Sequence, residues 1–164
     1  MARWPELTIL TAALAAAPVG LCARAPSTVD PAVLAQGALA CRGIPDEMAG
    51  AERRIVELGW PRAPQRNGAP PLPVFERDGM MVMLTPPDQE GHPLSCGVMA
   101  TVRRSVSAAD LATAVSAAFG RQPGPGDAGG FPVWELDGGQ VVAVATDGEG
   151  GVLFTFWYPR NTAH

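Results

Sequence analysis

The chain contains nearly the same heptapeptide twice, as PVFERDG at residues 73–79 and as PVWELDG at residues 132–138. When the sequence is shifted against itself by 59 residues, the agreement extends on both sides without a gap. Of the 39 positions from Val56 to Leu94, 14 are identical to their counterparts from Val115 to Leu153. Self-similarity at a fixed period is typical of a duplicated structural unit. We therefore predict an internal duplication, with repeats at residues 46–103 and 107–159.

Each repeat has the same predicted order of elements, beginning with a helix. Apolar residues at helical spacing predict helices at 47–59 and 107–119, and the second begins with a Ser-Ala-Ala-Asp capping box and ends at Gly120. An Asp-Gly pair then separates two short apolar runs in both copies. Asp-Gly is preferred in two-residue type I′ hairpin turns, because both positions need a positive φ. The predicted strands are 74–77, 80–85 and 95–103 in the first copy, and 133–136, 140–146 and 151–158 in the second.

These elements predict an α+β fold in a single domain, because a lone α-β-β-β unit cannot cover its own sheet face. Two tandem α-β-β-β repeats would form one antiparallel sheet of about six strands with the helices packed on one face. An N-terminal signal segment and an extra helix at 30–41, with Asp30 as its N-cap and Pro31 in its first turn, precede the repeats.

The first residues have the features of an export signal. Arg3 is followed by the run LTILTAALAAAPVGLC at residues 7–22, which is shorter than the about 20 apolar residues that a membrane span needs. We expect residues 1–27 to be a signal peptide and residues 28–164 to be the domain. The mature protein would be periplasmic or secreted, with no membrane span after signal removal. A lipid anchor on Cys22 and an uncleaved anchor are the alternatives.

Removal of the signal would leave two cysteines, Cys41 and Cys96. An even pair in an oxidising compartment predicts one structural disulfide. The alternative is a pair of buried thiols that act as small apolar side chains.

The composition disfavours several classes of function. The net charge is −4, and the 12 basic residues, all arginine, form no concentrated positive face, so no nucleic-acid partner is expected. The two histidines are His92, in a turn between Gly91 and Pro93, and the terminal His164, and there is no lysine. We therefore expect neither a Ser-His-Asp arrangement, a three-ligand catalytic zinc site nor a Schiff-base lysine. No phosphate-binding or dinucleotide-binding glycine motif is present. We therefore assign no catalytic residue, no metal ligand and no cofactor.

The remaining candidates for catalysis are carboxylates beside turns. Each predicted hairpin has a pair of them, Glu76 with Asp78 and Glu135 with Asp137. The alternative function is therefore a carboxylate-based hydrolase acting on cell-envelope material. Solvated acids are ordinary at such turns. Two later turns contain further carboxylates that form weak candidate acidic sites. These residues are Asp88, Glu90, Asp147 and Glu149. Each of these turns supplies two carboxylates, whereas calcium takes about 6–8 oxygen ligands.

Four methionines cluster in the first repeat: Met80, Met81, Met83 and Met99. Thioethers are soft ligands that suit copper(I), so a methionine-based metal-handling protein is a second alternative. Methionines of this kind also fill cores or form adaptable binding surfaces.

The last predicted strand is rich in aromatic residues. If its outer face is bare, Phe154, Phe156, Trp157 and Tyr158 form a candidate binding surface, and if a helix covers it they are core. The leading hypothesis is an exported, non-catalytic binding or interaction protein. Its ligand would be an unidentified protein or small molecule in the cell envelope.

Overall fold

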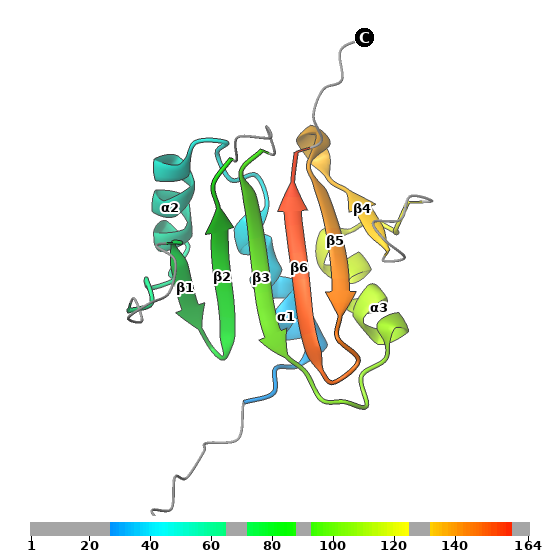
Figure 1. Ribbon diagram of the computed structural model, residues 1–164. Coiled ribbons are helices and arrows are strands. Elements are labelled where there is room, and N and C mark those ends of the chain that lie inside the picture. The colour runs from blue at the N-terminus through cyan, green and yellow to red at the C-terminus, as the bar shows by residue number, and fades with distance from the viewer. Residues whose placement is uncertain (1–26, 65–71, 88–92, 125–131, 159–164) are drawn as a thin grey trace, which may run out of the picture.

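The computed structural model describes residues 27–64, 72–87, 93–124 and 132–158. It shows one antiparallel sheet of six strands in the order β1-β2-β3-β6-β5-β4 (Figure 1). The strands are β1 Val74–Arg77, β2 Met80–Thr85, β3 Ser95–Thr101, β4 Val133–Glu135, β5 Val141–Thr146 and β6 Gly151–Trp157. The predicted α+β class with a six-stranded antiparallel sheet is confirmed.

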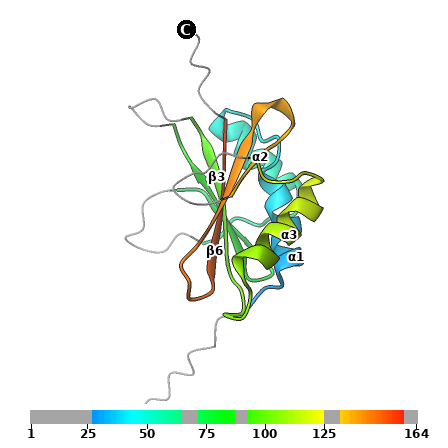
Figure 2. The ribbon, with the colours of Figure 1, turned by 90° about the vertical axis from the view of Figure 1, so that its right-hand side faces the viewer.

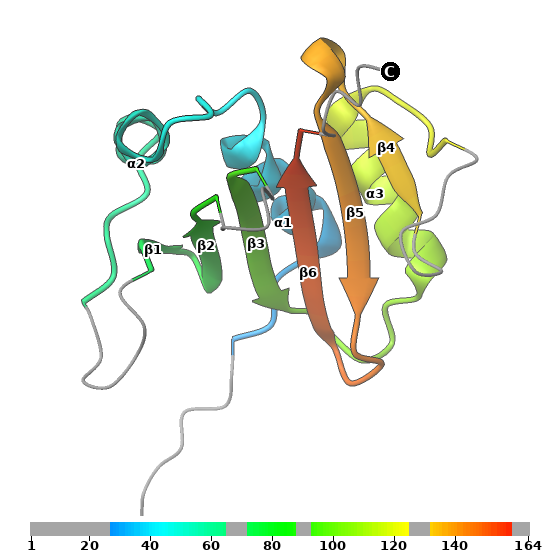
Figure 3. The ribbon, with the colours of Figure 1, turned by 45° about the horizontal axis from the view of Figure 1, so that its top comes forward.

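Three α-helices lie on one side of this sheet (Figure 2). They are α1 Pro31–Ala38, which continues into the short 3-10 helix η1 Leu39–Cys41, then α2 Met48–Glu57 and α3 Ala108–Phe119. In the tilted view α1 and α3 pack side by side, while α2 stands apart beside the first two strands (Figure 3). The helices therefore cover one sheet face, as the sequence predicted.

The helix ends follow the sequence signals. The Asp30 side chain accepts a hydrogen bond from the backbone N–H of Ala32 at 2.8 Å. At α3, Ser107 and Asp110 form the reciprocal capping box, and the helix ends at Gly120 with a left-handed φ of 68°. Each contact satisfies a backbone group that the helix itself leaves without a partner.

The core lies between the sheet and the helices. Successive side chains on a strand point to opposite faces, so strand pairing places one buried row across the sheet. This row comprises Phe75, Val82, Val98, Phe154 and Val144, which are direct neighbours on adjacent strands. All five are at most 5% exposed.

A disulfide joins Cys41 at the end of η1 to Cys96 on β3, with the two Cα atoms 5.7 Å apart. Both cysteines are fully buried. The predicted disulfide is confirmed, and it fixes the first helical segment to a central strand.

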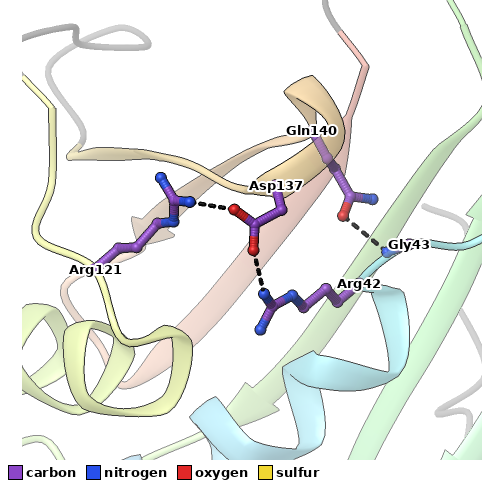
Figure 4. A network of polar contacts seen from close by, with 5 residues as sticks. All are labelled: Arg42, Gly43, Arg121, Asp137 and Gln140. Carbon is purple, nitrogen blue, oxygen red and sulfur yellow. Dashed lines mark hydrogen bonds and ion pairs between the residues drawn. The ribbon is translucent and has the colours of Figure 1, made fainter.

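A buried glutamine, Gln140, adds a second link to this segment. The Gln140 side chain is 1% exposed. Its Nε2 donates to the Cys41 carbonyl at 2.9 Å. Its Oε1 accepts from the Gly43 backbone N–H at 3.0 Å (Figure 4). Gln140 therefore connects the end of the first helical segment to the turn between β4 and β5.

The strand order matches what two tandem units would give, since β1-β2-β3 and β6-β5-β4 meet at the β3–β6 pair. The gapless offset of 59 is not kept throughout, however. Phe75 pairs with Val82, whereas Trp134, 59 residues after Phe75, pairs with Val142, 60 residues after Val82. Val141, the predicted counterpart of Val82, consequently projects to the other face. The duplication itself stays a prediction.

The extra residue lies in the second hairpin turn. In the first turn Asp78 and Gly79 have φ values of 53° and 79°, so the predicted type I′ turn is confirmed there. In the second turn the positive φ values belong to Gly138 and Gly139, both at 78°, and the Leu136 N–H donates to the Gln140 carbonyl at 2.7 Å. The predicted Asp137-Gly138 type I′ turn is wrong, because the loop has three residues and the two glycines take the left-handed positions.

Replacing Gly79 with valine is expected to lower the free energy of unfolding by roughly 1 kcal/mol or more, because a β-branched residue tolerates a positive φ poorly. A Cβ at this position would also lie 2.7 Å from the Ser27 Oγ. Gly138→Val should show the backbone penalty alone, since nothing lies within 4 Å of its added Cβ. Urea denaturation measures both, and wild-type stability for the two variants would contradict the assigned turns.

Both edges of the sheet are partly covered by neighbouring backbone. The Ala63 N–H donates to the Val74 carbonyl at 2.8 Å, and the Glu76 N–H donates to the Pro61 carbonyl at 3.1 Å. On the opposite edge the Gly124 N–H donates to the Val133 carbonyl at 2.8 Å. Pairing of this kind reduces the capacity of an edge strand to recruit another chain.

The predicted signal segment at residues 1–27 falls, except for Ser27, outside the described residues. Within the ranges that the structure describes, no helix combines the length and the hydropathy needed to cross a bilayer.

Candidate functional site

The sheet face opposite the helices, which we call the open face, is the main candidate site. None of the described helices lies over it (Figure 2). Strand alternation places on it Val74, Glu76, Met81, Met83, Thr85, Ser95, Gly97, Met99, Thr101, Val133, Glu135, Val141, Ala143, Ala145, Gly151, Leu153, Thr155 and Trp157. Twelve of these eighteen are apolar when glycine is counted as apolar, and an exposed face of that composition is typical of an interaction surface.

A shallow depression of about 520 Å³ occupies one end of this face. Met81, Met99 and Leu153, which are neighbours across three adjacent strands, form part of its lining. Thr146 and Asp147 line the depression where β5 ends. The depression is therefore an open, mainly apolar hollow with a carboxylate at one end.

The few charged side chains of the strands are divided between the two faces. They are Glu76, Arg77 and Glu135. Glu76 and Glu135 are exposed on the open face, at its two edges. Arg77 projects to the other face, where its Nη1 donates to the Leu58 carbonyl at 3.0 Å and its guanidinium lies 4.5 Å from the Trp60 ring centroid. The charge that the strands contribute to the open face is thus entirely negative.

The aromatic candidates of β6 are divided between the two faces. Phe154 and Phe156 are 0% and 1% exposed, so the candidate surface is corrected: both belong to the core under the helices. Phe156 also contacts Phe119 of α3, with ring centroids 5.8 Å apart. Trp157, which points the other way, is partly exposed on the open face, and Tyr158 after the strand is also partly exposed. Trp157 and Tyr158 remain candidates for binding.

The hairpin carboxylates do not converge. Glu76 and Glu135 lie on the two outermost strands, roughly 24 Å apart at the usual strand spacing. Glycoside hydrolysis needs two carboxyl groups about 5–9.5 Å apart. The turns that carry Asp78 and Asp137 lie at opposite ends of the sheet (Figure 1). The two hairpin pairs therefore cannot act together on one bond.

Asp137 has a structural role instead. Its carboxylate accepts hydrogen bonds from Arg42 Nη2 at 2.9 Å and from Arg121 Nη2 (Figure 4). Arg42 follows η1 and Arg121 follows α3, so this exposed ion-pair network connects three segments that are distant in sequence. The Asp137 carboxylate therefore serves as the shared partner of two guanidinium groups.

The acidic turns are only partly described. Asp88 and Glu90 lie outside the described residues. Asp147 Oδ1 accepts from the backbone N–H groups of Glu149 at 2.7 Å and Gly151 at 2.8 Å, which closes the β5–β6 turn. These bonds hold the pKa of Asp147 below its ordinary value. In the part of the chain covered by the structure, no three His, Cys, Asp or Glu side chains are grouped to hold a metal ion.

The lowered pKa of Asp147 predicts a pH-dependent contribution to stability. A carboxyl group whose folded-state pKa lies below its unfolded value of 3.8 stabilises the fold above that value. The contribution is lost as the pH falls through the folded-state pKa. Asp147→Asn should therefore be less stable than wild type at neutral pH, and the difference should vanish in acid. Thermal unfolding between neutral and strongly acidic pH measures this, and a constant difference would contradict it.

The four clustered methionines fall into two groups. Met80 is 3% exposed and packs in the core, where its Sδ would lie 2.6 Å from a Cβ added to Gly37. Met81, Met83 and Met99 are partly exposed and share the open face. The spacing of Met81 and Met83 predicts that these two share a strand face, but the sequence alone did not show that Met99 joins them.

The fold and this face define an α+β protein with one covered and one open sheet face, held by a buried disulfide. No family model, no curated protein and no solved structure matches the chain.

Proposed function

We propose that this chain is an exported, non-catalytic binding protein whose open face docks a partner protein with apolar side chains surrounded by positive charge. The observation that carries the proposal is the character of the open face. It is mostly apolar, none of the described helices covers it, and the strand charges on it are Glu76 and Glu135. Complementary charge at the rim of an apolar patch favours the matching partner and disfavours others.

The disulfide supports the exported part of the proposal. Cys41 and Cys96 are bonded and fully buried. Such bonds persist in oxidising compartments and are rare where thiols are kept reduced. The signal peptide expected at residues 1–27 agrees with this placement.

The geometry favours face-on docking over strand addition. Backbone groups of both edge strands are already paired with the segments around Ala63 and Gly124. The face measures roughly 25 by 20 Å from ordinary strand dimensions. An area of about 500 Å² per partner lies below the about 800 Å² of a standard stable interface, so the proposed complex is reversible.

We also infer that the two halves arose by duplication. The shared heptapeptide places Glu76 and Glu135 at equivalent positions of the two edge strands. A duplicated unit would thus supply the same carboxylate at both edges of one binding surface.

Site-specific photocrosslinking tests the docking face. A photoreactive amino acid at Thr155, which lies on the open face, should give a discrete adduct with the partner in cells that export the protein. The matched control is Arg53, which is exposed on α2 on the helix side. A second substitution, Leu153→Glu, should abolish the Thr155 adduct. Equal adducts from Arg53, or none from Thr155, would refute docking on this face.

Calorimetry with the partner identified in this way then tests whether Glu76 and Glu135 attract a positively charged partner. Glu76→Lys/Glu135→Lys should weaken binding and reduce its dependence on salt, because rim charges act mainly through long-range attraction. Unchanged affinity and salt dependence in this variant would refute the proposal that the partner is positively charged.

A further inference from the structure

We infer that Met81, Met83 and Met99 form a binding site for a soft monovalent metal ion, copper(I) or its analogue silver(I). This site goes beyond the proposed docking function and does not depend on it. These three methionines share the open face, whereas the fourth clustered methionine, Met80, is buried on the opposite face.

The strand register brings the three side chains together. Met81 and Met99 are direct partners in the β2–β3 pair. Directly opposed residues have Cβ atoms about 4.5–5.5 Å apart. Met83 is the next residue of β2 on the same face, about 7 Å further along the strand. A methionine side chain has three rotatable bonds, so the three sulfur atoms can reach one ion without backbone movement.

The surroundings leave room for an ion and balance its charge. The direct partner of Met83 is Gly97, which places no side chain beside it. The Leu153 side chain covers part of the space above Gly97, because its Cδ1 would be 3.4 Å from a Cβ added there, so the room for an ion lies toward the depression that Met81 and Met99 line. Glu76 is the direct partner of Met81 on its other side and supplies a negative charge next to the neutral thioethers. Met81 and Met99 line the open depression, so the ion can enter from solvent.

The ligand type selects the metal. Thioether sulfur is a soft, neutral donor that suits copper(I), whereas magnesium and calcium prefer oxygen and zinc prefers imidazole or thiolate. A thioether has no proton to lose in the ordinary pH range, so metal affinity should not change between neutral and mildly acidic pH. A site built from histidine would lose affinity over this range, because the imidazole becomes protonated.

Silver(I) is the probe for the test, because it needs no reductant and so leaves the Cys41–Cys96 disulfide intact. The oxidised protein, labelled with carbon-13 on its methionine methyl groups, is titrated with silver nitrate in chloride-free buffer. We expect one equivalent to bind. The methyl resonances of Met81, Met83 and Met99 should shift, and those of Met48 and Met80 should not.

Substitutions by leucine isolate the thioethers from the apolar surface. Each single variant, Met81→Leu, Met83→Leu or Met99→Leu, should lower silver affinity by at least about tenfold, since loss of even an outer-shell partner costs about 10–100-fold. Met80→Leu is the matched control and should bind as wild type does. Leucine and methionine are similar in volume, so the variants should fold.

Two results would overturn the site. One is retention of wild-type silver affinity in all three single variants, and the other is a loss of affinity between pH 7 and pH 5 as large as that of a histidine site. The leucine variants keep the open face apolar and retain Glu76 and Glu135. Partner docking should therefore persist in them, so the metal site and the docking function can fail separately.

Discussion

Phe154→Ala is expected to lower the free energy of unfolding by about 3–5 kcal/mol, the usual cost of removing a buried aromatic side chain. Phe154 is fully buried, with Val98 and Val144 as its direct partners on the two neighbouring strands. Alanine would leave a cavity at the centre of the sheet, where rigid strands on both sides limit relaxation. Urea denaturation at neutral pH measures the loss.

Trp157→Ala on the same strand is the matched control. Trp157 is three residues away and points to the open face, where it is partly exposed. Its removal should change stability by much less than that of Phe154, because little of the core is lost. The same change should weaken partner binding if the open face is the docking surface. Equal destabilisation by the two variants would contradict the assignment of the faces.

The double substitution Cys41→Ala/Cys96→Ala should destabilise the protein by about 4 kcal/mol on the chain-entropy estimate for a loop of this length. The bonded residues are 55 positions apart, so the bond removes much of the freedom of the unfolded chain. Removing it also leaves η1 attached to the sheet through weaker contacts such as those of Gln140. Guanidinium denaturation of the oxidised protein and of the variant measures the difference.

Reduction supplies the control for this prediction. Wild-type protein in a strong thiol reductant should approach the stability of the double variant, while the variant itself should not respond to the reductant. A wild-type protein equally stable with and without reductant would show that the bond does not stabilise the fold.

Local signals in the sequence predicted much of this fold. The Ser107 capping box, the Asp30 N-cap and the Asp78-Gly79 turn each depend on contacts between residues close in sequence, and all three are present. The disulfide could be predicted because the expected removal of residues 1–27, which include Cys22, leaves only Cys41 and Cys96 to pair.

Features that depend on distant segments could not be predicted in the same way. Phe154, Phe156 and Trp157 are all aromatic, and only the position of the helices decides which of them are covered. The extra residue in the second hairpin turn was hidden, because Gly139 follows an otherwise ordinary Asp-Gly signal. Gln140 gave no signal at all, since its partners lie 97 and 99 residues earlier in the chain.

The methionine cluster could be predicted only in part from the sequence. The spacing of Met81 and Met83 predicts that they share a strand face. Met99 joins them only because β3 pairs with β2 in a register that places Met99 opposite Met81. A shift of that register by one residue would move the third thioether to the helix side.

The position of β6 has a consequence for synthesis. This final described strand lies in the middle of the sheet, between β3 and β5, and it supplies Phe154 and Phe156 to the interior. A nascent chain that has emerged from the ribosome only as far as residue 150 holds β1-β2-β3 and the β4-β5 hairpin without the strand that joins them. The complete sheet therefore cannot form until residues 151–157 have also emerged.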